Sequence, residues 1–437
     1  MAGFSLPSWW PRRQSGAWCR TALATDPSLQ GAVDATAAQL RGSEEADLAL
    51  VFASASYASD LPRLLPLLRQ KLRAQHWLGC LGGGVVGAGS DGVPHELERE
   101  PGLSVTLLRL PGAQLHPFAI DGGDLPDLDG PAEPWLKLLG AGDATEGEAE
   151  SAQALARAGS MLLLVDPGCP AINDLINGLD YACPAAAKVG GIAGQHSAPH
   201  GSLLFGDQVR GGAVGCVIDG AWALEPVVAQ GCRPIGPVLE VEQAQRNVVL
   251  QVSEGGSRQS SPVAALQAIL TELSPEEREL VKHSLFLGVA RRDFSVVDSD
   301  GEAPAAFLVR NLIGVDPRNG AVAVGERMRV GQQVQFHLRD GDTSRQELEQ
   351  LLRAQARRQG EPLAGLLFAC LGRGKGLYGQ PDGDAGPCHT IFPEMPLAGA
   401  FCNGEIGPVG GSTHLHGYTA SFGFLVPRAT ESAEGAR

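Results

Sequence analysis

Short apolar runs recur along the chain, and most of them are bounded by glycine or proline. Three of these runs, at residues 48–53, 161–165 and 366–370, are apolar at nearly every position. Continuous apolar runs of this length predict strands that are buried on both faces. The 58 glycines and 30 prolines divide the chain into many short elements joined by tight turns. The pattern therefore predicts a fold rich in sheet.

Helices are predicted between the strands by their capping residues. Asp26 followed by Pro27 predicts an N-cap and a first helical residue. Ser274 and Pro275 repeat this arrangement, and Glu277 can complete a capping box with Ser274. Further helices are predicted at residues 65–75, 172–179 and 344–358, and another is predicted to begin at Pro262 with Ser261 as its cap.

One order of elements occurs three times. An apolar strand ends in a small-residue loop, a second strand runs into glycine-rich backbone, and a third strand follows. The second strands read HWLGCLGGGVVGAG, AKVGGIAGQ and PLAGAFCNGEIGPVGG. This similarity predicts a repeated supersecondary unit. The glycines indicate backbone that lies close to another strand or to a ligand.

The composition excludes several classes of partner. The formal net charge is -15, and no cluster of Lys and Arg suits nucleic acid or an anionic membrane. The nearest approach, residues 353–358, is typical of the solvent-facing side of a helix. No apolar run approaches the roughly 18–20 residues that span a bilayer. We therefore expect no nucleic-acid or membrane partner.

The nine cysteines indicate a reducing compartment. They form no CxxC pair and no quartet with ligand spacing. Cys80, Cys216, Cys370 and Cys402 lie in or beside apolar strands, where a free thiol packs as a small hydrophobe. We expect a cytoplasmic protein.

Several stretches resemble the FIST_N and FIST_C modules of bacterial signal-transduction proteins and eukaryotic F-box proteins. The most specific are LLFACLGRG (366–374), AGAFCNGEIGPVGG (398–411) and LHGYTASFGFL (415–425). With GAVGCVIDG, VVAQGCRPIG and LPGAQL they cover nearly the whole chain from about residue 17. The resemblance implies a sensor of small ligands, with amino acids or related metabolites as the expected class. We expect neither an F-box nor an appended output domain, so a signalling protein would act in trans.

With this resemblance, the predicted fold class is α+β: two lobes of mixed, largely antiparallel sheets layered with helices. The FIST_N-like lobe is expected at residues 21–238 and the FIST_C-like lobe at 239–428. Within the first lobe, residues 121–158 are acidic and rich in proline and glycine, which predicts a surface excursion ending in a short helix. Residues 1–20 and 429–437 are expected to be disordered.

The predicted ligand site lies in the FIST_C-like lobe, at strand ends and tight loops. Arg373 offers a planar fork for a carboxylate, and Glu405 could receive an ammonium group. Such a pair suits a zwitterion, and flexible glycines would let backbone approach it. The alternative is that Arg373 and Glu405 pair with each other and hold two loops together. The predicted ligand-binding residues are Cys370, Arg373, Gly374, Asn403, Gly404, Glu405 and His416.

Other motifs in the sequence could support a cofactor, a metal or catalysis. The motifs GGGVVG (82–87) and GKGLYG (374–379) fit a dinucleotide-binding pattern, but neither is predicted to open a helix, so no nucleotide cofactor is expected. His414 and His416 share a strand face, although a hydrogen-bonded His416 is favoured over a metal ligand. Cys370 or Cys402 with His416 could form a nucleophile–base pair.

These observations favour a sensory small-molecule-binding protein without catalytic, metal or cofactor chemistry. A Cys/His-dependent hydrolase or transferase is the enzymatic alternative. A protein-docking scaffold without a metabolite is the third reading.

Overall fold

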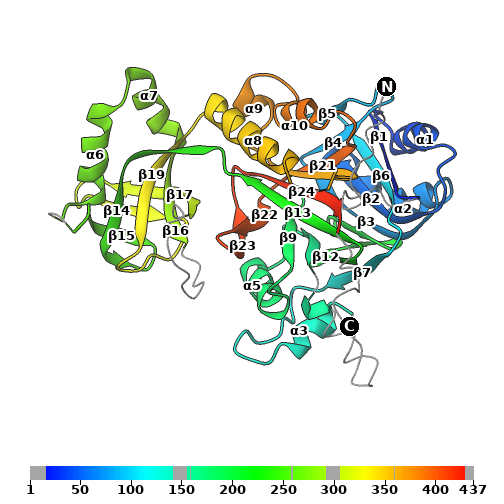
Figure 1. The fold of residues 1–437 in the computed structure, drawn as a ribbon, viewed down its shortest axis with the longest axis horizontal. Coiled ribbons are helices and arrows are strands. Elements are labelled where there is room, and N and C mark those ends of the chain that lie inside the picture. Colours follow the sequence, from blue (N-terminus) through cyan, green and yellow to red (C-terminus); the bar gives the residue numbers. More distant parts are fainter. Residues whose placement is uncertain are drawn as a thin grey trace, which may run out of the picture.

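The computed structural model describes residues 16–140, 155–157, 159–256, 259–291, 306–358 and 360–428. It has two parts (Figure 1): a body of three six-stranded sheets and a closed six-stranded barrel. The sheets are mixed and packed against helices, which confirms the predicted α+β class.

The body consists of three repeats, and the barrel is inserted in the third. Repeat 1 contains β1 (Trp18–Ala24), α1 (Leu29–Gln39), β2 (Ala46–Ser54), η1 (Ala55–Asp60), α2 (Leu61–Arg69), β3 (Ala74–Gly82), β4 (Gly84–Ala88), β5 (Pro94–Leu97) and β6 (Leu103–Arg109). Repeat 2 contains β7 (Ala113–Ile120), α3 (Glu133–Leu138), β8 (Ser160–Val165), α5 (Ile172–Ala182), β9 (Ala187–Ile192), β10 (Leu203–Phe205), β11 (Gln208–Arg210) and β12 (Ala213–Gly220).

Repeat 3 contains β13 (Trp222–Ala229), α8 (Gly341–Ala356), β20 (Ala364–Cys370), α9 (Lys375–Tyr378), α10 (Ala385–Ile391), β21 (Leu397–Cys402), β22 (Glu405–Val409), β23 (Ser412–His416) and β24 (Ala420–Pro427). The barrel between β13 and α8 contains β14 (Cys232–Gln245), β15 (Val248–Ser253), α6 (Pro262–Glu272), α7 (Pro275–Ser284), β16 (Leu285–Arg291), β17 (Ala306–Asp316), β18 (Ala321–Val324) and β19 (Gln333–Arg339).

The three sheets of the body share one strand order. They run β1-β6-β2-β3-β10-β11, β7-β12-β8-β9-β22-β23 and β13-β24-β20-β21-β4-β5. Each has two central parallel strands, an antiparallel pair on one side and a hairpin on the other. Each hairpin belongs to a different repeat from the rest of its sheet, so the repeats exchange hairpins cyclically. The repeated order seen in the sequence is a true structural repeat.

A ring of backbone hydrogen bonds joins the repeats where the glycine-rich strand ends meet. Gly83 N–H donates to Phe401, Gly194 N–H to Leu81, and Asn403 N–H to Ile192. A Cβ atom added to Gly194 would lie 2.7 Å from the carbonyl carbon of Gly82. The glycines at these strand ends therefore allow other strands to approach closely. The sequence had left open whether they lie close to another strand or to a ligand.

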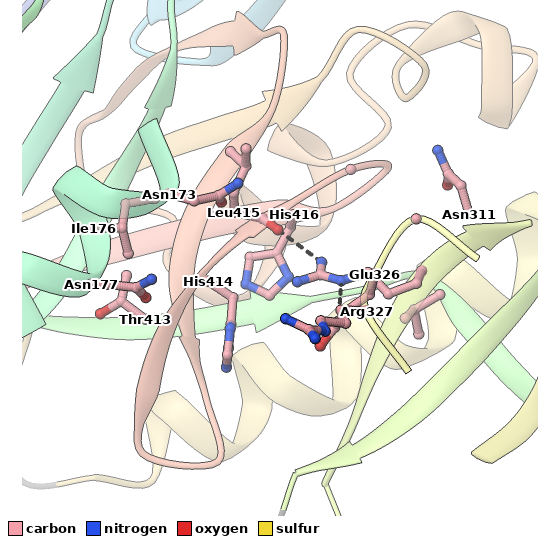
Figure 2. Close-up of a pocket in the computed structure, with 14 residues that line it drawn as sticks. Asn173, Ile176, Asn177, Asn311, Glu326, Arg327, Thr413, His414, Leu415 and His416 are labelled. Atoms are coloured by element: carbon pink, nitrogen blue, oxygen red, sulfur yellow. Dashed lines mark hydrogen bonds and ion pairs between the residues drawn. The ribbon is translucent and has the colours of Figure 1, made fainter. Parts of the chain in front are cut away.

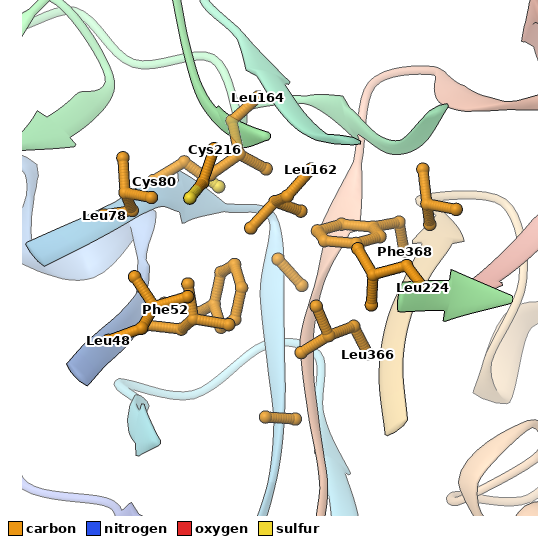
Figure 3. Packing of buried hydrophobic residues seen from close by; sticks show 14 of the residues in the cluster. Leu48, Phe52, Leu78, Cys80, Leu162, Leu164, Cys216, Leu224, Leu366 and Phe368 are labelled. Atoms are coloured by element: carbon orange, nitrogen blue, oxygen red, sulfur yellow. The ribbon is translucent and has the colours of Figure 1, made fainter. Parts of the chain in front are cut away.

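The main core lies where the inner faces of the three sheets meet (Figure 3). Each repeat contributes apolar side chains from its first parallel strand, including Phe52, Leu164 and Phe368. The outer faces are covered by helices in equivalent places: α1 and α2, α3 and α5, and α8 and α10. The barrel has a separate core, which includes Val289 and Phe336.

Two crossings connect the barrel to the body. The first passes through Gly231, whose N–H donates to Glu347 and whose carbonyl accepts from Ser344. Gly231 has φ +67, which favours glycine. The second runs from β19 into Asp340, the N-cap of α8.

The structure corrects several predicted elements. The N-cap of α1 is Ser28 rather than Asp26, whose carboxylate instead accepts from Ser28. The helix predicted at 65–75 is α2, displaced towards the N-terminus. The strand predicted at 413–425 is divided by the turn 417–419. The capping box of α7 is confirmed.

The predicted domain boundary lies within a strand of the barrel, and the predicted surface excursion contains a helix of the body. The boundary expected at residue 238 falls inside β14, and strands from both sides of it pair in the same sheets. Within residues 121–158, α3 buries Trp135 against α5. Residues 155–157 are helical, while 141–154 and 158 lie outside the described residues. β1 begins at Trp18, and residues 1–15 and 429–437 are likewise outside.

Candidate functional site

An open cleft of about 610 Å³ separates the barrel from the body (Figure 2). One wall comes from α5 and β23 of the body, and the other from β17 and the loop after β18. The lining is mostly polar. It consists of Asn173, Ile176, Asn177, Val309, Arg310, Asn311, Gly325, Glu326, Arg327, Thr413, His414, Leu415, His416 and Gly417.

Arg310 bridges the two walls. Its Nη1 donates to the carbonyl of Leu415 at 2.8 Å, and its Nε donates to Glu326 at 2.8 Å. Arg291 also pairs with Glu326, so one carboxylate faces two guanidinium groups. Arg327 adds a third positive charge at the rim. With neutral histidines the cleft carries an excess of positive charge, which suits an anionic group.

The two histidines of β23 are neutral at pH 7. Burial lowers the pKa of His416 to about 3, and burial with Arg291 and Arg310 lowers that of His414 to about 4. His416 Nε2 lies 3.0 Å from the carbonyl of Gly407 and must donate to it. In the neutral ring Nδ1 is then an acceptor. Among the described residues, nothing donates to it.

Behind the cleft, Arg373 is fully buried and saturated by protein groups. Its Nε and Nη2 donate to Asp384 at 2.8 and 2.6 Å, and Nη2 also reaches the hydroxyl of Tyr378. Burial opposes the charge of Arg373, but Asp384 outweighs it and raises the pKa. Arg373 does form an ion pair, as the alternative prediction held. Its partner, however, is Asp384 and not Glu405.

Asp384 in turn connects repeat 3 to repeat 1. The buried carboxylate of Glu96 on β5 accepts from the N–H groups of Asp384 and Ala385 at the start of α10. Burial and the Asp384 charge raise the pKa of Glu96 to about 8.

Glu405 is also fully buried, but it is incompletely bonded. Its Oε2 accepts from the N–H of Thr419 at 3.1 Å, whereas Oε1 has no hydrogen-bond partner within the described chain. Burial raises the pKa of Glu405 to about 8, opposed by the Thr419 bond and by Arg373 and Cys370 nearby.

The turn 417–419 lies between this buried cluster and the cleft. Tyr418 has φ +64, an uncommon conformation for a residue other than glycine. Its ring lies 4.6 Å from the guanidinium of Arg339, and its carbonyl accepts from Arg373. Gly417 lines the cleft on the other side. The turn thus contacts both the cleft and the buried charges.

The remaining predicted site residues contact protein groups. The side chain of Asn403 is exposed, and its N–H belongs to the ring described above. Gly374 has φ +61 and lies against the carboxylate of Glu98. Gly404 lies against Leu415 and Ile192.

Neither glycine motif opens a nucleotide-binding helix. Residues 82–84 pass directly into β4. The loop at 374–379 does open a helix, contrary to the prediction, but α9 is one turn long and Glu98 accepts from its first N–H.

Across the described residues no three His, Cys, Asp or Glu are grouped to hold a metal ion. None of the nine cysteines forms a disulfide. No described helix is both long enough and apolar enough to span a membrane.

Comparison with known families decides the classification. Residues 47–254 match the FIST N domain model and residues 264–408 match the FIST C domain model. The chain belongs to the FIST family. FIST domains are generally sensory domains of signal-transduction proteins.

Relatives of similar length occur in mycobacteria. An uncharacterized protein of Mycobacterium tuberculosis is 34% identical over 413 residues, covering 92% of this chain and 98% of the relative. Another, from Mycobacterium bovis, is 32% identical over 414 residues, covering 92% and 97%. An F-box/LRR-repeat protein of Arabidopsis thaliana is 27% identical over 137 residues, covering 30% of this chain and 26% of that protein.

The sequence indicated only part of the cleft. His416 was predicted, but Asn177, Arg310, Glu326 and Arg327 were not. They come from a helix of repeat 2 and from the barrel, and no local pattern unites them. The one available signal was the pair of alternating histidines on β23.

Proposed function

We propose that this FIST protein is a sensor that binds a small polar metabolite in the cleft between barrel and body. The supporting observation is that the two walls belong to separately packed parts joined by two chain crossings and bridged by the Arg310–Leu415 bond. A ligand that contacts both walls favours one relative placement of the parts. Differential affinity of this kind is what a sensor requires.

The chemistry of the cleft favours a ligand with an acidic group and a nearby donor. Arg327 and the Nη2 edge of Arg310, which bonds no other group within the described part of the chain, suit a carboxylate. The exposed side-chain amides of Asn177 and Asn311 in the lining can accept from an amino or hydroxyl donor on the same ligand. The volume falls in the range of about 300–1,000 Å³ that metabolite sites occupy. Amino acids and related metabolites meet these requirements.

The predicted ligand contacts of Arg373 and Glu405 stay predictions. Arg373 already holds a protein carboxylate, and both side chains lie behind the turn 417–419. The open cleft is the better-supported place for a ligand. Output through a separate signalling protein and a cytoplasmic location remain part of the proposal.

A thermal-shift screen of amino acids and other small carboxylates would test the proposal. A ligand at a hundred times its Kd should stabilise the protein by about 2.7 kcal/mol. Arg327→Ala should abolish the shift, whereas Arg329→Ala, in the same loop but outside the cleft lining, should retain it. Equal shifts in both variants, or none with any carboxylate, would contradict the proposed site.

The same ligand separates the sensor from the enzymatic alternative. After incubation with the protein it should be recovered unchanged by mass spectrometry. Its consumption, lost in Cys370→Ala, would replace the sensor with a hydrolase or transferase.

A further inference from the structure

The three repeats allow an internal comparison of equivalent positions. The equivalent residues at the end of the first parallel strand of each repeat are Ser54, Asp166, which directly follows β8, and Cys370. The backbone N–H of each donates to an equivalent carbonyl, on Gly102, Gly212 and Thr419 respectively, at 2.8–3.0 Å. Around these strand ends the backbone is therefore equivalent in the three repeats, so the residues there can be compared side chain by side chain.

One buried position changes character in repeat 3. Val85, Leu203 and Glu405 face equivalent residues of the neighbouring strand, Ala400, Cys80 and Gly191. All three are fully buried. Two repeats fill the position with an aliphatic side chain, so the fold does not require a carboxylate there. Burying Glu405 with Oε1 unpartnered costs stability, which indicates another role.

The nearest reactive group to this carboxyl is the thiol of Cys370. The thiol favours the ionised form of Glu405, although no hydrogen bond of normal geometry reaches Oε1. Cys370 is partly exposed. Burial and the charge of Glu405 raise the pKa of its thiol, and Arg339 only opposes this rise, so the thiol needs a base to take its proton before it can react. Glu405, with a pKa of about 8, can take up and return a proton near neutral pH.

A second thiol lies directly across the strand pair. Cys370 on β20 and Cys402 on β21 are register partners in a parallel ladder, so their side chains lie on the same face. Neighbouring strands are spaced about 4.8 Å apart, and disulfides form at Cα separations of about 4.4–6.8 Å. Cys402 is fully buried, which leaves Cys370 as the thiol that a solute meets first.

We propose that Cys370 and Cys402 form a redox modification site in which Glu405 acts as the base for Cys370 and the oxidant is a peroxide. Glu405 takes the thiol proton as the Cys370 sulfur attacks one peroxide oxygen. The O–O bond breaks, the sulfur becomes a sulfenic acid, and the proton returns to the departing oxygen to give water. The Cys402 sulfur then attacks the Cys370 sulfur, the S–O bond breaks, and the departing oxygen takes the Cys402 thiol proton and leaves as a second water. The two thiols are oxidised to a disulfide and one peroxide is reduced.

This site is independent of the ligand proposed for the cleft, since it involves none of the side chains that line it. Its product would join the ends of β20 and β21 next to Thr419, whose carbonyl accepts from Cys370. Because the turn 417–419 borders the cleft, formation of the disulfide would change the shape of the cleft.

Peptide mapping after graded hydrogen peroxide treatment tests the site. The Cys370–Cys402 linked peptide should appear about tenfold faster than oxidation of Cys19 and Cys232, which are also partly exposed. A thiol reductant should reverse it. In Cys402→Ala, which places there the residue of the equivalent position Ala193, a sulfenic acid should be trapped on Cys370 by a cyclic 1,3-diketone.

Glu405→Gln and Glu405→Val test the base. Both should slow oxidation of Cys370 about tenfold, and Glu405→Val should fold because repeats 1 and 2 carry aliphatic residues there. Oxidation of Cys19 or Cys232 as fast as Cys370 would overturn the proposal. So would an unchanged Cys370 rate in both Glu405 variants.

Discussion

Repeats 1 and 2 of the body differ from repeat 3 in where they place charge. The equivalent residues three positions after Ser54, Asp166 and Cys370 are Tyr57, Cys169 and Arg373. All three are buried. The hydroxyl of Tyr57 is satisfied by one backbone carbonyl, on Asp26. Arg373 needs Asp384 and Tyr378, and Asp384 is linked to Glu96 of another repeat.

The difference shows that the shared fold does not require a buried charge at this position. Repeat 3 is also the repeat that carries the barrel, and its charges lie beside the barrel strand β19 and the turn 417–419. Groups that are expensive to bury and unnecessary for the fold point to function. The comparison therefore supports the proposed site, where the inserted barrel contacts the body, and substitutions can test it.

The largest expected effect concerns a glycine that all three repeats share. A Cβ atom at Gly79, Gly190 or Gly399 would lie 1.7–1.8 Å from a carbonyl oxygen of the adjacent strand. Gly190→Ala should cost about 5 kcal/mol or more of unfolding free energy, measured by urea denaturation. Gly314→Ala, which meets no atom within 4 Å, is the control. A mild effect at Gly190 would mean that the strands are less closely packed.

The next largest effect is expected for the buried ion pair of repeat 3, between Arg373 and Asp384. Asp384→Ala should destabilise the protein by about 3–5 kcal/mol, because Arg373 is left buried without its carboxylate. Asp207→Ala, at an exposed turn, should change stability by less than about 0.5 kcal/mol. If the two variants unfold at similar urea concentrations, the ion pair does not organise this region.

Glu405 should make stability depend on pH. Its pKa is about 8 in the fold and 4.5 as the ordinary value, so its contribution is complete below pH 4.5 and is lost as the pH rises towards 8. Glu405→Gln should reduce the stability difference between pH 5 and pH 8 by about 2–3 kcal/mol. The pKa of Glu96 is raised in the same direction, so Glu96 should cause the pH dependence that remains in this variant. An unchanged pH profile would show that Glu405 is not buried as described.

The smallest effect is expected in the barrel. Ser274 caps α7 with a complete capping box, but α7 has no buried residue. Ser274→Ala should therefore cost only about 1 kcal/mol, and Ser284→Ala at the other end of the helix should cost less. A loss comparable to that of Asp384→Ala would mean that the barrel and body unfold as one unit.

Local features of the fold could be predicted from the sequence. The central strands, the capping box at Ser274 and the threefold order of elements depend on neighbouring residues and are confirmed. The exchange of hairpins could not be predicted, because pairing Val85 with Ala400 follows from no local pattern. The first helix was assigned the wrong cap because Asp26 and Ser28 are both capping residues.

The candidate site was harder to predict from the sequence, because its residues also come together from distant segments. The FIST resemblance indicated the region of Arg373, Glu405 and His416, but not their partners. Asp384 lies in a loop without a charge pattern, and Arg310 comes from an inserted barrel. The break at Tyr418 was missed because residues 413–425 were assigned to one strand, although only residues after Thr419 are mainly apolar. The positive φ there is held by tertiary contacts.

The hairpin exchange has a consequence for how the protein is made. The hairpin β4–β5 ends at Leu97, but its partner β21 begins at Leu397. At about 5–20 residues per second, a ribosome needs on the order of tens of seconds to supply that partner. Until then β4 exposes an unpaired edge with Val85 and Val86, the kind of edge that pairs with other chains. The nascent chain is therefore most vulnerable to aggregation before its last strands emerge.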